Sequence, residues 1–178
     1  MLLRKDALKK YIRSVPDFPR PGINFYDITT LLQNPAGFTL ALEAMEEFAR
    51  SKQTETILAV ESRGFLFGAA LADRLEAGLV LARKKGKLPY RTVSVEYALE
   101  YGTDSLEVHE DAVVKGERVL IVDDLIATGG TLQAVCKMVE QLSAEVVGIS
   151  AVIDLSFLPW REKLAAYDVN CLVSYDSE

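Results

Sequence analysis

Residues that bind transition metals or form disulfides are scarce in this sequence, which has one histidine and two cysteines among 178 residues. Cys136 and Cys171 lie far apart in apolar segments, and the chain has no CxxC pair and no Cys/His cluster with zinc-ligand spacing. We therefore exclude a structural zinc site and a disulfide framework. The two cysteines are interpreted as buried thiols of a protein from a reducing compartment.

Long hydrophobic runs are also missing. The longest apolar run covers residues 64–72, whereas a membrane-spanning helix needs about 20 residues. The N-terminal segment has neither the hydrophobic core nor the cleavage site of a secretory signal. Its apolar residues recur at helical spacing and predict an amphipathic helix that packs on the body or on a partner subunit, rather than on a membrane; these residues are Leu3, Ala7, Leu8, Tyr11, Ile12 and Val15. We expect a cytoplasmic protein with no membrane partner.

An excess of basic residues is absent, because 20 Lys and Arg stand against 26 Asp and Glu, for a net charge of −6. Domains that bind nucleic acid are usually strongly basic, so we expect no nucleic-acid partner. Hydrophobic residues make up 49% of the chain and charged residues 26%, which is typical of a globular protein. At this length we expect a single domain, residues 1–178.

Short apolar runs alternate with amphipathic segments along most of the chain. The runs predict strands at 56–60, 78–82, 118–122, 145–153 and 170–175, and helices that begin at Asn34-Pro35, at Gly64 and after residue 131. Strands that are apolar on both faces and separated by helices indicate an α/β fold, with a mostly parallel sheet flanked by helices. Ligands of such sheets bind beyond the carboxyl ends of the strands, which here means residues 61–64, 83–87 and 123–131.

The segment 83–117 has a different character. It is polar, and residues 92–97 and 105–109 alternate with period two. This pattern indicates one or two antiparallel strands with a long loop. Loops of this length in compact domains are usually functional or disordered. We interpret the segment as a mobile lid, with a purely structural hairpin as the alternative.

The most informative motif is VLIVDDLIATGGT, residues 119–131. A hydrophobic strand is expected to end at two adjacent carboxylates, Asp123 and Asp124, before a small-residue loop that opens a helix. Backbone N–H groups of such a loop and the positive end of the helix together form a phosphate cradle. The spacing matches neither a Walker A loop nor GxGxxG. Carboxylates in this position can accept hydrogen bonds from sugar hydroxyls or hold Mg²⁺ through water.

Two basic features lie at the same expected edge of the sheet. Arg63 follows the strand 56–60 and sits beside Gly64, where its guanidinium could reach a phosphate in bidentate fashion. The run RKKGK at 83–87 follows the strand 78–82. Basic residues concentrated in an acidic protein suggest an anionic substrate, although such a run can also be a solvated surface.

Two further residues have competing interpretations. Glu100 lies in the candidate lid and, taken alone, resembles a surface acid. Phe25 follows the stiff segment FPRPG (18–22) and could present a flat ring to a ligand or plug the core. The residue type alone does not show which of the two roles Glu100 or Phe25 has.

The 119–131 motif resembles the 5-phosphoribosyl pyrophosphate (PRPP) binding motif of the type I phosphoribosyltransferases, and every position of that pattern matches. Four other segments occur with it in the same order: FPRPGINFYDIT, SRGFLFG, RKKGKLP and YALEYGTDSLE. Together they are similar to the adenine phosphoribosyltransferases, over about residues 12–145. The resemblance implies the Rossmann-like fold of the type I family, in which 1–33 form an N-terminal helix and base-pocket segment and 83–117 form the lid.

The resemblance also implies an activity. The family transfers the 5-phosphoribosyl group of PRPP to N9 of adenine, giving AMP and pyrophosphate in purine salvage, with Mg²⁺ as cofactor. It is typically a homodimer. The Mg²⁺ ion is then bound mainly through PRPP, with water bridges to Asp123 and Asp124.

Residue roles carried over from the family fall into two groups. At the base, Phe25 would stack on adenine, backbone atoms near Ile23 and Tyr26 would read its edge, and Leu125 would cover its other face. At PRPP, the acid pair would contact the ribose hydroxyls, Glu100 and Arg63 would be catalytic, and Tyr101 would close the lid. The phosphate-binding set is Arg63, Arg83, Lys87, Asp123, Asp124, Ala127, Thr128, Gly129, Gly130 and Thr131.

One departure leaves alternatives open. Position 26 is Tyr, where the family commonly has Arg, so the base could differ from adenine if that side chain matters. A phosphoribosyltransferase for another purine is therefore the second hypothesis. A PRPP-sensing regulator without catalysis is the third, although the chain has no length for a nucleic-acid-binding domain and its isoelectric point is near 5.0.

Overall fold

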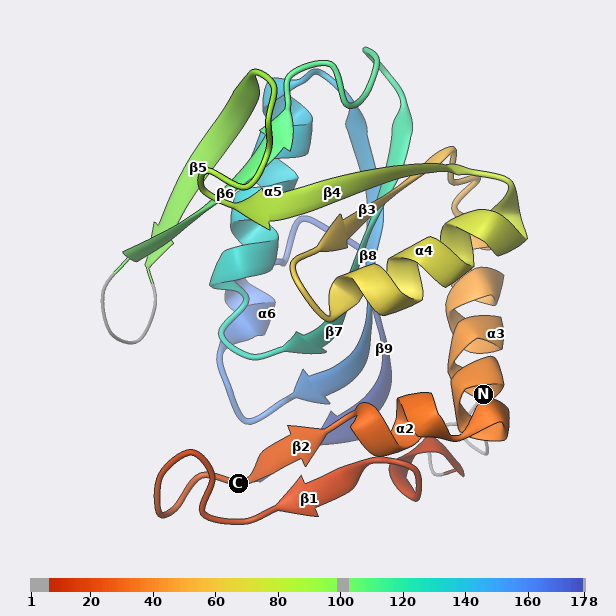
Figure 1. Ribbon diagram of the computed structural model, residues 1–178, viewed down its shortest axis with the longest axis vertical. Helices are drawn as coiled ribbons and strands as arrows, with labels where there is room; N and C mark the ends of the chain where they lie inside the picture. Colours follow the sequence, from red (N-terminus) through yellow and green to blue (C-terminus); the bar gives the residue numbers. More distant parts are fainter. Residues whose placement is uncertain (1–6, 99–102, 178) are drawn as a thin grey trace.

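A seven-stranded sheet in the order β5-β6-β4-β3-β7-β8-β9 forms the centre of the computed structural model (Figure 1). The structure describes residues 7–98 and 103–177. Five neighbouring strands are parallel: β4 (Gly78–Lys84), β3 (Thr56–Val60), β7 (Arg118–Ile126), β8 (Glu145–Leu155) and β9 (Val169–Tyr175). The three central strands, β3, β7 and β8, are largely apolar and buried, and the parallel pairing confirms the predicted sheet.

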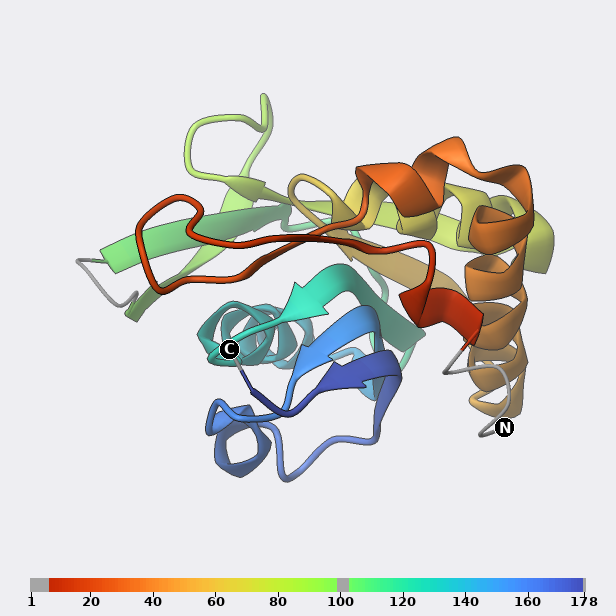
Figure 2. The same ribbon diagram turned by 90° about the horizontal axis from the view of Figure 1, so that it is seen from below.

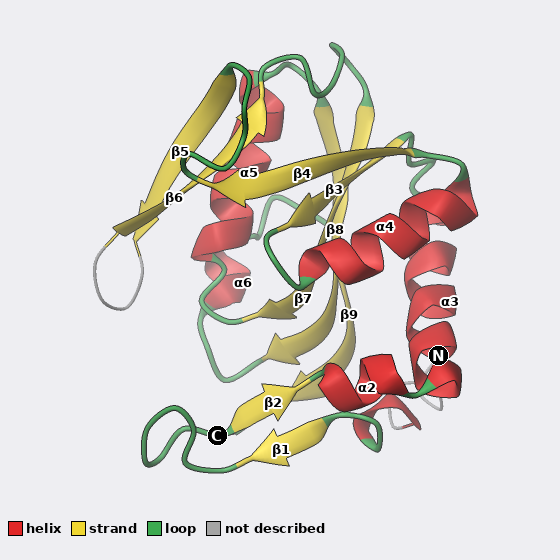
Figure 3. Ribbon diagram, in the orientation of Figure 1, coloured by secondary structure: helices red, strands yellow, loops and turns green. Residues whose placement is uncertain are grey.

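The predicted antiparallel excursion is also present. β5 (Thr92–Ala98) and β6 (Thr103–His109) pair antiparallel with each other, and β6 pairs antiparallel with the end of β4, at Arg83↔Glu107 and Lys84↔Leu106. Figure 3 shows the two strands projecting from one edge of the sheet. The excursion therefore extends the central sheet and brings its strands next to the end of β4.

Helices cover both faces of the sheet, as Figure 2 shows. α3 (Pro35–Ser51), α4 (Gly64–Leu75) and the short α2 (Thr29–Gln33) pack on one face, and α5 (Gly130–Gln141) and α6 (Trp160–Lys163) on the other. None of the helices in the described residues has the length and apolar character that crossing a membrane requires. The two cysteines lie on different elements: Cys136 is buried on α5, and Cys171 is half-buried on β9.

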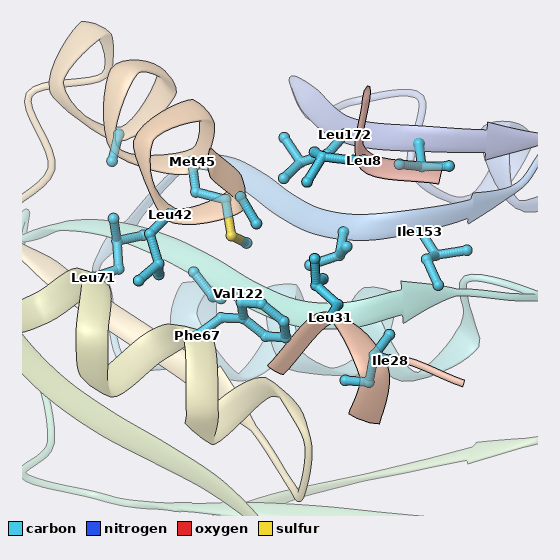
Figure 4. Packing of buried hydrophobic residues seen from close by; sticks show 14 of the residues in the cluster. Leu8, Ile28, Leu31, Leu42, Met45, Phe67, Leu71, Val122, Ile153 and Leu172 are labelled. Atoms are coloured by element: carbon cyan, nitrogen blue, oxygen red, sulfur yellow. The ribbon is translucent and has the colours of Figure 1, made fainter. Parts of the chain in front are cut away.

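The start of α3 follows from its sequence. The Asn34 side chain accepts a hydrogen bond from the Gly37 N–H at 3.0 Å, and Pro35 occupies the first helical position, both of which favour a helix N-terminus. Figure 4 shows the result, with Leu42 and Met45 of α3 packed toward Phe67 of α4 above the sheet. The predicted helix start is therefore confirmed.

The N-terminal segment differs from the prediction. Val15 belongs to β1 (Arg13–Val15), which pairs antiparallel with β2 (Phe25–Asp27), so the predicted helical pattern through Val15 is wrong. Pairing with a strand ten residues away outweighs the local apolar spacing. Leu8 and Ile12 are buried in the core on the α3 side, so this segment packs on the body.

The strand that carries the acid pair is longer than expected. β7 continues to Ile126, and the prediction that it ends before Asp123 is wrong. Hydrogen bonding to β8 explains the extension, because Asp123 lies opposite Ala151 and Leu125 opposite Ile153. The loop is correspondingly short, since α5 already begins at Gly130.

Candidate active site

A cavity of about 510 Å³ lies at the carboxyl ends of β3 and β7. Its walls come from the segments that follow these strands and from the excursion at the sheet edge. The lining consists of residues 60–63, 123–129, 131–132, Lys84, Tyr97 and Asp104. The parallel sheet thus places the cavity at the carboxyl edge, where ligands of this architecture bind.

Two carboxylates form the floor of the cavity. Asp123 is 8% exposed and Asp124 is 5% exposed, and the Asp124 N–H donates to Oδ1 of Asp123 at 2.8 Å. Burial, reinforced by the charge of Asp124, raises the pKa of Asp123 well above its usual value. Burial also raises the pKa of Asp124, while Arg63 acts in the opposite direction. Holding two acids this close is costly, which indicates that a ligand uses them.

Arg63 is the cation nearest to this pair. Its Nε lies 2.8 Å from Oδ2 of Asp124, yet that buried oxygen has no aligned hydrogen-bond donor within the described residues. Oδ2 therefore keeps a lone pair for a hydroxyl or a metal-bound water. Gly64 allows this approach, because a Cβ there would lie 2.8 Å from the carbonyl oxygen of Val122.

The predicted phosphate loop, residues 127–131, runs from the end of β7 into α5. We call this segment the phosphate loop. Gly129 has a φ of +76°, in the left-handed region that glycine adopts without strain. A Cβ on Gly129 would also lie only 3.0 Å from Cβ of Trp160. The loop leads directly into the first turn of the 12-residue helix α5, whose positive end favours an anion. Gly130 and Thr131, expected in the loop, belong to this first turn.

The basic run contributes a lysine that the sequence did not single out for the site. Lys84 lines the cavity, and its Nζ lies 3.3 Å from Oδ2 of Asp104. The Tyr97 hydroxyl donates to the same oxygen at 3.5 Å. Tyr97 and Asp104 face each other across β5 and β6, so the period-two pattern held the signal that would have paired them.

Arg83 and Lys87, by contrast, do not line the cavity. Arg83 donates through Nε to Oε2 of Glu61 at 3.3 Å and through a terminal nitrogen to the Lys87 carbonyl at 3.4 Å. Glu61 also accepts from the Lys84 N–H at 2.8 Å. Burial acts to raise the pKa of Glu61, but these hydrogen bonds outweigh it and lower that pKa. Glu61 was missed by the sequence reasoning and ties β3 to the basic run.

The base-pocket segment adjoins the cavity at Arg63. The Phe25 ring centroid lies 5.7 Å from Cζ of Arg63, and Phe18 packs edge-on against Phe25 with centroids 5.2 Å apart. Leu125 lines the cavity itself. Ile23 is exposed and lies outside the lining. Phe25 thus lies beside Arg63, the residue that pairs with Asp124.

Tyr26 points away from the cavity. It is buried, and its ring stacks on Tyr175 of β9 with centroids 3.7 Å apart and planes at 21°. Its hydroxyl donates to the Ser177 carbonyl at 3.4 Å. The side chain is therefore part of the core, and Tyr26 is not among the residues that line the cavity. Glu100 and Tyr101 lie outside the described residues, so their predicted roles stay predictions.

Comparison with known proteins agrees with this geometry. The model of the phosphoribosyl transferase domain family matches residues 27–171. The adenine phosphoribosyltransferase of Brachyspira hyodysenteriae is 57% identical over 168 residues, covering 94% of this chain and 99% of that protein. The crystal structure of adenine phosphoribosyltransferase from Thermoanaerobacter pseudethanolicus superposes with a TM-score of 0.92 at 49% identity, over 96% of this chain and 99% of the other.

A third relative was solved with ligands. The Saccharomyces cerevisiae adenine phosphoribosyltransferase, complexed with an imino-altritol bisphosphate and adenine, has a TM-score of 0.92 at 38% identity, over 97% of this chain and 99% of the other. The match extends along nearly the whole chain in each case. The chain therefore belongs to the phosphoribosyltransferase family and, within it, to the adenine phosphoribosyltransferases.

Proposed function

We propose that this protein transfers the 5-phosphoribosyl group of PRPP to N9 of adenine, releasing pyrophosphate and giving AMP for purine salvage. The observation that carries the proposal is the buried pair Asp123 and Asp124, set between Arg63 and a phosphate loop at the end of a parallel strand. The one ligand that uses all three features at once is a sugar with hydroxyls, a 5′-phosphate and a second anionic group.

PRPP would lie along the cavity in one orientation. Residues 127–131 would hold the 5′-phosphate through backbone N–H groups and the positive end of α5. The carboxylates of Asp123 and Asp124 would accept hydrogen bonds from the ribose hydroxyls. Arg63 and Lys84, both in the cavity wall, would then face the pyrophosphate, with Arg83 and Lys87 next to them in the chain.

The reaction exchanges one bond at the anomeric carbon for another. The C1–O bond breaks with its electron pair going to pyrophosphate, N9 of adenine forms the new bond, and the base loses a proton. Fixed positive groups stabilise the charge that develops on the leaving pyrophosphate. Glu100 would accept or orient a proton near N7 of the base, and Tyr101 would help the lid exclude water. No covalent nucleophile is needed.

The cavity also suits Mg²⁺. When bound, the ion neutralises charge on the pyrophosphate. No three carboxylate, histidine or cysteine side chains converge as a metal cage within residues 7–98 and 103–177. Oδ2 of Asp124, which has no aligned hydrogen-bond donor within the described residues, fits a metal-bound water, since Mg²⁺ usually keeps waters and binds through substrate phosphates. We therefore propose that PRPP holds the ion and that Asp123 and Asp124 contact it through water.

Adenine is the base that the geometry favours. Phe25, whose ring lies beside Arg63, would stack on it, Leu125 would cover its other face, and backbone atoms near Ile23 and Tyr26 would read its edge. The departure at position 26 does not alter this pocket, because the Tyr26 side chain is buried against Tyr175. Adenine recognition at this position then depends on the backbone alone.

The protein is proposed to work as a homodimer in the cytoplasm. Leu79 and Leu81 on β4 and Leu66 on α4 are exposed large apolar side chains, and side chains of this kind are commonly covered by a partner subunit. The measurement that checks this is the molar mass by light scattering, where a value near 19.7 kDa, the mass of one chain, would contradict it.

A spectrophotometric panel tests the activity. Purified protein, PRPP and Mg²⁺ are mixed separately with adenine, hypoxanthine, guanine and xanthine, and nucleotide formation is followed. We expect AMP from adenine alone, and no product when Asp123→Asn and Asp124→Asn are combined. Turnover of a 6-oxopurine would keep the fold and chemistry but reject the base assignment. Binding of PRPP without turnover of any base would favour a PRPP-sensing regulator.

A further inference from the structure

Another buried carboxylate, Asp154, takes no part in the reaction described above. It lies on β8 opposite Ile126, the last residue of β7 before the phosphate loop, and it is only 3% exposed. Its Oδ1 accepts from the indole N–H of Trp160 at 2.6 Å. Its Oδ2 accepts from Arg161 at 3.0 Å and from the Ser174 hydroxyl at 3.1 Å. Asp154 thus joins the first residues of α6 to β8 and β9.

The residue that Asp154 holds also touches the phosphate loop. Cα of Trp160 would lie 3.3 Å and its Cβ 3.0 Å from a Cβ placed on Gly129, so the main chain of α6 is in close contact with the loop (Figure 1). The indole is buried in the same apolar cluster as Ile126 and Leu132, which flank the loop on either side. Arg161 covers the ring, with Cζ 4.4 Å from its centroid.

We propose that Asp154 is a positioning residue that acts through Trp160 to keep the phosphate loop in its phosphate-binding conformation. The inference rests on the proposed function, because it takes residues 127–131 as the 5′-phosphate site. Glycine has several accessible backbone conformations, so Gly129 does not keep its φ of +76° unaided. Contact with Trp160 restricts the backbone of Gly129. The charge-assisted hydrogen bonds of the buried Asp154 carboxylate in turn hold Trp160 and Arg161 in place.

The arrangement also provides its own spectroscopic reporter. Trp160 is the only tryptophan in the chain, and it lies against the loop that a phosphate would occupy. Its fluorescence should therefore change when ribose 5-phosphate or AMP binds, and should not change with adenine alone. This signal follows the loop in the intact protein without an added label.

The experiment compares ribose 5-phosphate affinity in the wild-type protein and four variants. Asp154→Asn keeps the size of the side chain but replaces an acceptor with a donor that faces Arg161 and Ser174. Trp160→Phe keeps an aromatic ring but loses the N–H that Asp154 accepts. We expect each to raise the Kd for ribose 5-phosphate about tenfold, as for the loss of one hydrogen bond to a charged group. The matched controls are Glu162→Gln, exposed on α6, and Leu42→Ala, buried in α3 on the opposite face of the sheet.

Kinetics separate positioning from general destabilisation. In both test variants KM for PRPP should rise with Kd, while kcat and KM for adenine change by less than about twofold. Leu42→Ala lowers Tm through a core cavity and should leave the Kd unchanged. An equal rise of Kd in Leu42→Ala would overturn the inference, as would unchanged affinity in both test variants.

Two further outcomes are also decisive. If wild-type protein binds no ribose 5-phosphate, the phosphate-loop assignment of the proposed function fails, and the inference fails with it. If the wild type binds and turns over adenine while the test variants bind equally well, only the inference fails. If Asp154→Asn does not fold, Trp160→Phe alone provides the comparison. Its ribose 5-phosphate affinity is measured by calorimetry, because this variant lacks the tryptophan whose fluorescence reports binding.

Discussion

Nε of Arg63 lies 2.8 Å from Oδ2 of Asp124, while Cζ of the same guanidinium lies 5.7 Å from the ring centroid of Phe25. One side chain therefore contacts the acid pair proposed for the ribose and the aromatic residue proposed for the base. A planar group with several donors can serve both contacts at once, whereas an ammonium group acts as a point charge.

Arg63→Lys should consequently lower kcat/KM for PRPP by about 10- to 100-fold, because the charge remains but the fork geometry is lost. Steady-state kinetics at saturating adenine give this value. Arg74→Lys is the matched control, since Arg74 lies on the same helix α4 and pairs with Glu46 at 3.3 Å away from the cavity. Equal kinetics for Arg63→Lys and wild type would show that only its charge matters.

Asp123→Asn should stabilise the protein while weakening PRPP binding. Burial raises the pKa of Asp123 in the folded state, so the folded protein binds more protons than the unfolded chain between the usual value of 3.8 and the raised one. The free energy of unfolding therefore falls as pH rises through that window. We expect Tm at pH 8 to increase by about 2–4 °C in the variant, for about 1 kcal/mol in a chain of this size.

Calorimetric melting at several pH values checks this stability prediction, and titration with PRPP checks the loss of affinity. The variant should also lose less stability than wild type as the pH rises from about 4. A lower Tm for Asp123→Asn across the whole range would mean that the ionised pair is stabilising without substrate, contrary to our interpretation.

Gly129→Ala should raise KM for PRPP more than 10-fold. A methyl group would meet Cβ of Trp160 at 3.0 Å, and the φ of +76° costs a residue with a Cβ about 1–2 kcal/mol. Gly116→Ala is the matched control, because Gly116 has a φ of +80° with nothing within 4 Å of an added Cβ. The control separates backbone strain from the contact, and similar KM values for both variants would contradict the prediction.

Phe25→Ala should raise KM for adenine at least 10-fold and leave KM for PRPP within about twofold, because base stacking is worth about 1–3 kcal/mol. Initial rates with each substrate varied in turn provide the comparison. Tyr90→Ala, which removes an exposed aromatic ring, is the control. If both KM values rose equally, Phe25 would be a core residue, as the alternative interpretation of its sequence holds.

Glu100→Ala should lower kcat by about 100-fold or more, the usual range for loss of a general acid or base. The glutamate lies outside the described residues, so this prediction rests on its place in the family motif. Glu96→Ala, an exposed acid on β5, is the comparison variant. Single-turnover rates of AMP formation measure the chemical step, and near-normal rates would remove Glu100 from it.

The fold was largely predictable because the chain alternates buried runs with amphipathic segments. Thr56–Val60 is buried throughout and Asn34 caps α3 through a local hydrogen bond, and both signals lie within a few residues. Val15 was misjudged because its structure depends on pairing with Phe25. The extension of β7 past Asp123 likewise depends on β8, more than 20 residues further along the chain.

The site shows the same division. Asp123, Asp124 and residues 127–131 are adjacent in sequence, so their spacing alone predicted that they lie together at the end of a strand, as the cavity lining shows. The period-two pattern of β5 and β6 could have paired Tyr97 with Asp104, but Lys84 meets them only because β6 folds back beside β4. The contact of Trp160 with Gly129 joins two segments about 30 residues apart, so neither segment's sequence predicts it.

The stacking of Tyr26 on Tyr175 joins segments that a ribosome completes at very different times. The Tyr26 hydroxyl reaches Ser177, 151 residues later, which at about 5–20 residues per second means a delay of roughly 8–30 s. Until β9 has been synthesised, Tyr26 in the base-pocket segment lacks its stacking partner, Tyr175. Nascent chains should therefore acquire adenine binding late, when β9 docks on the sheet, rather than gradually during translation.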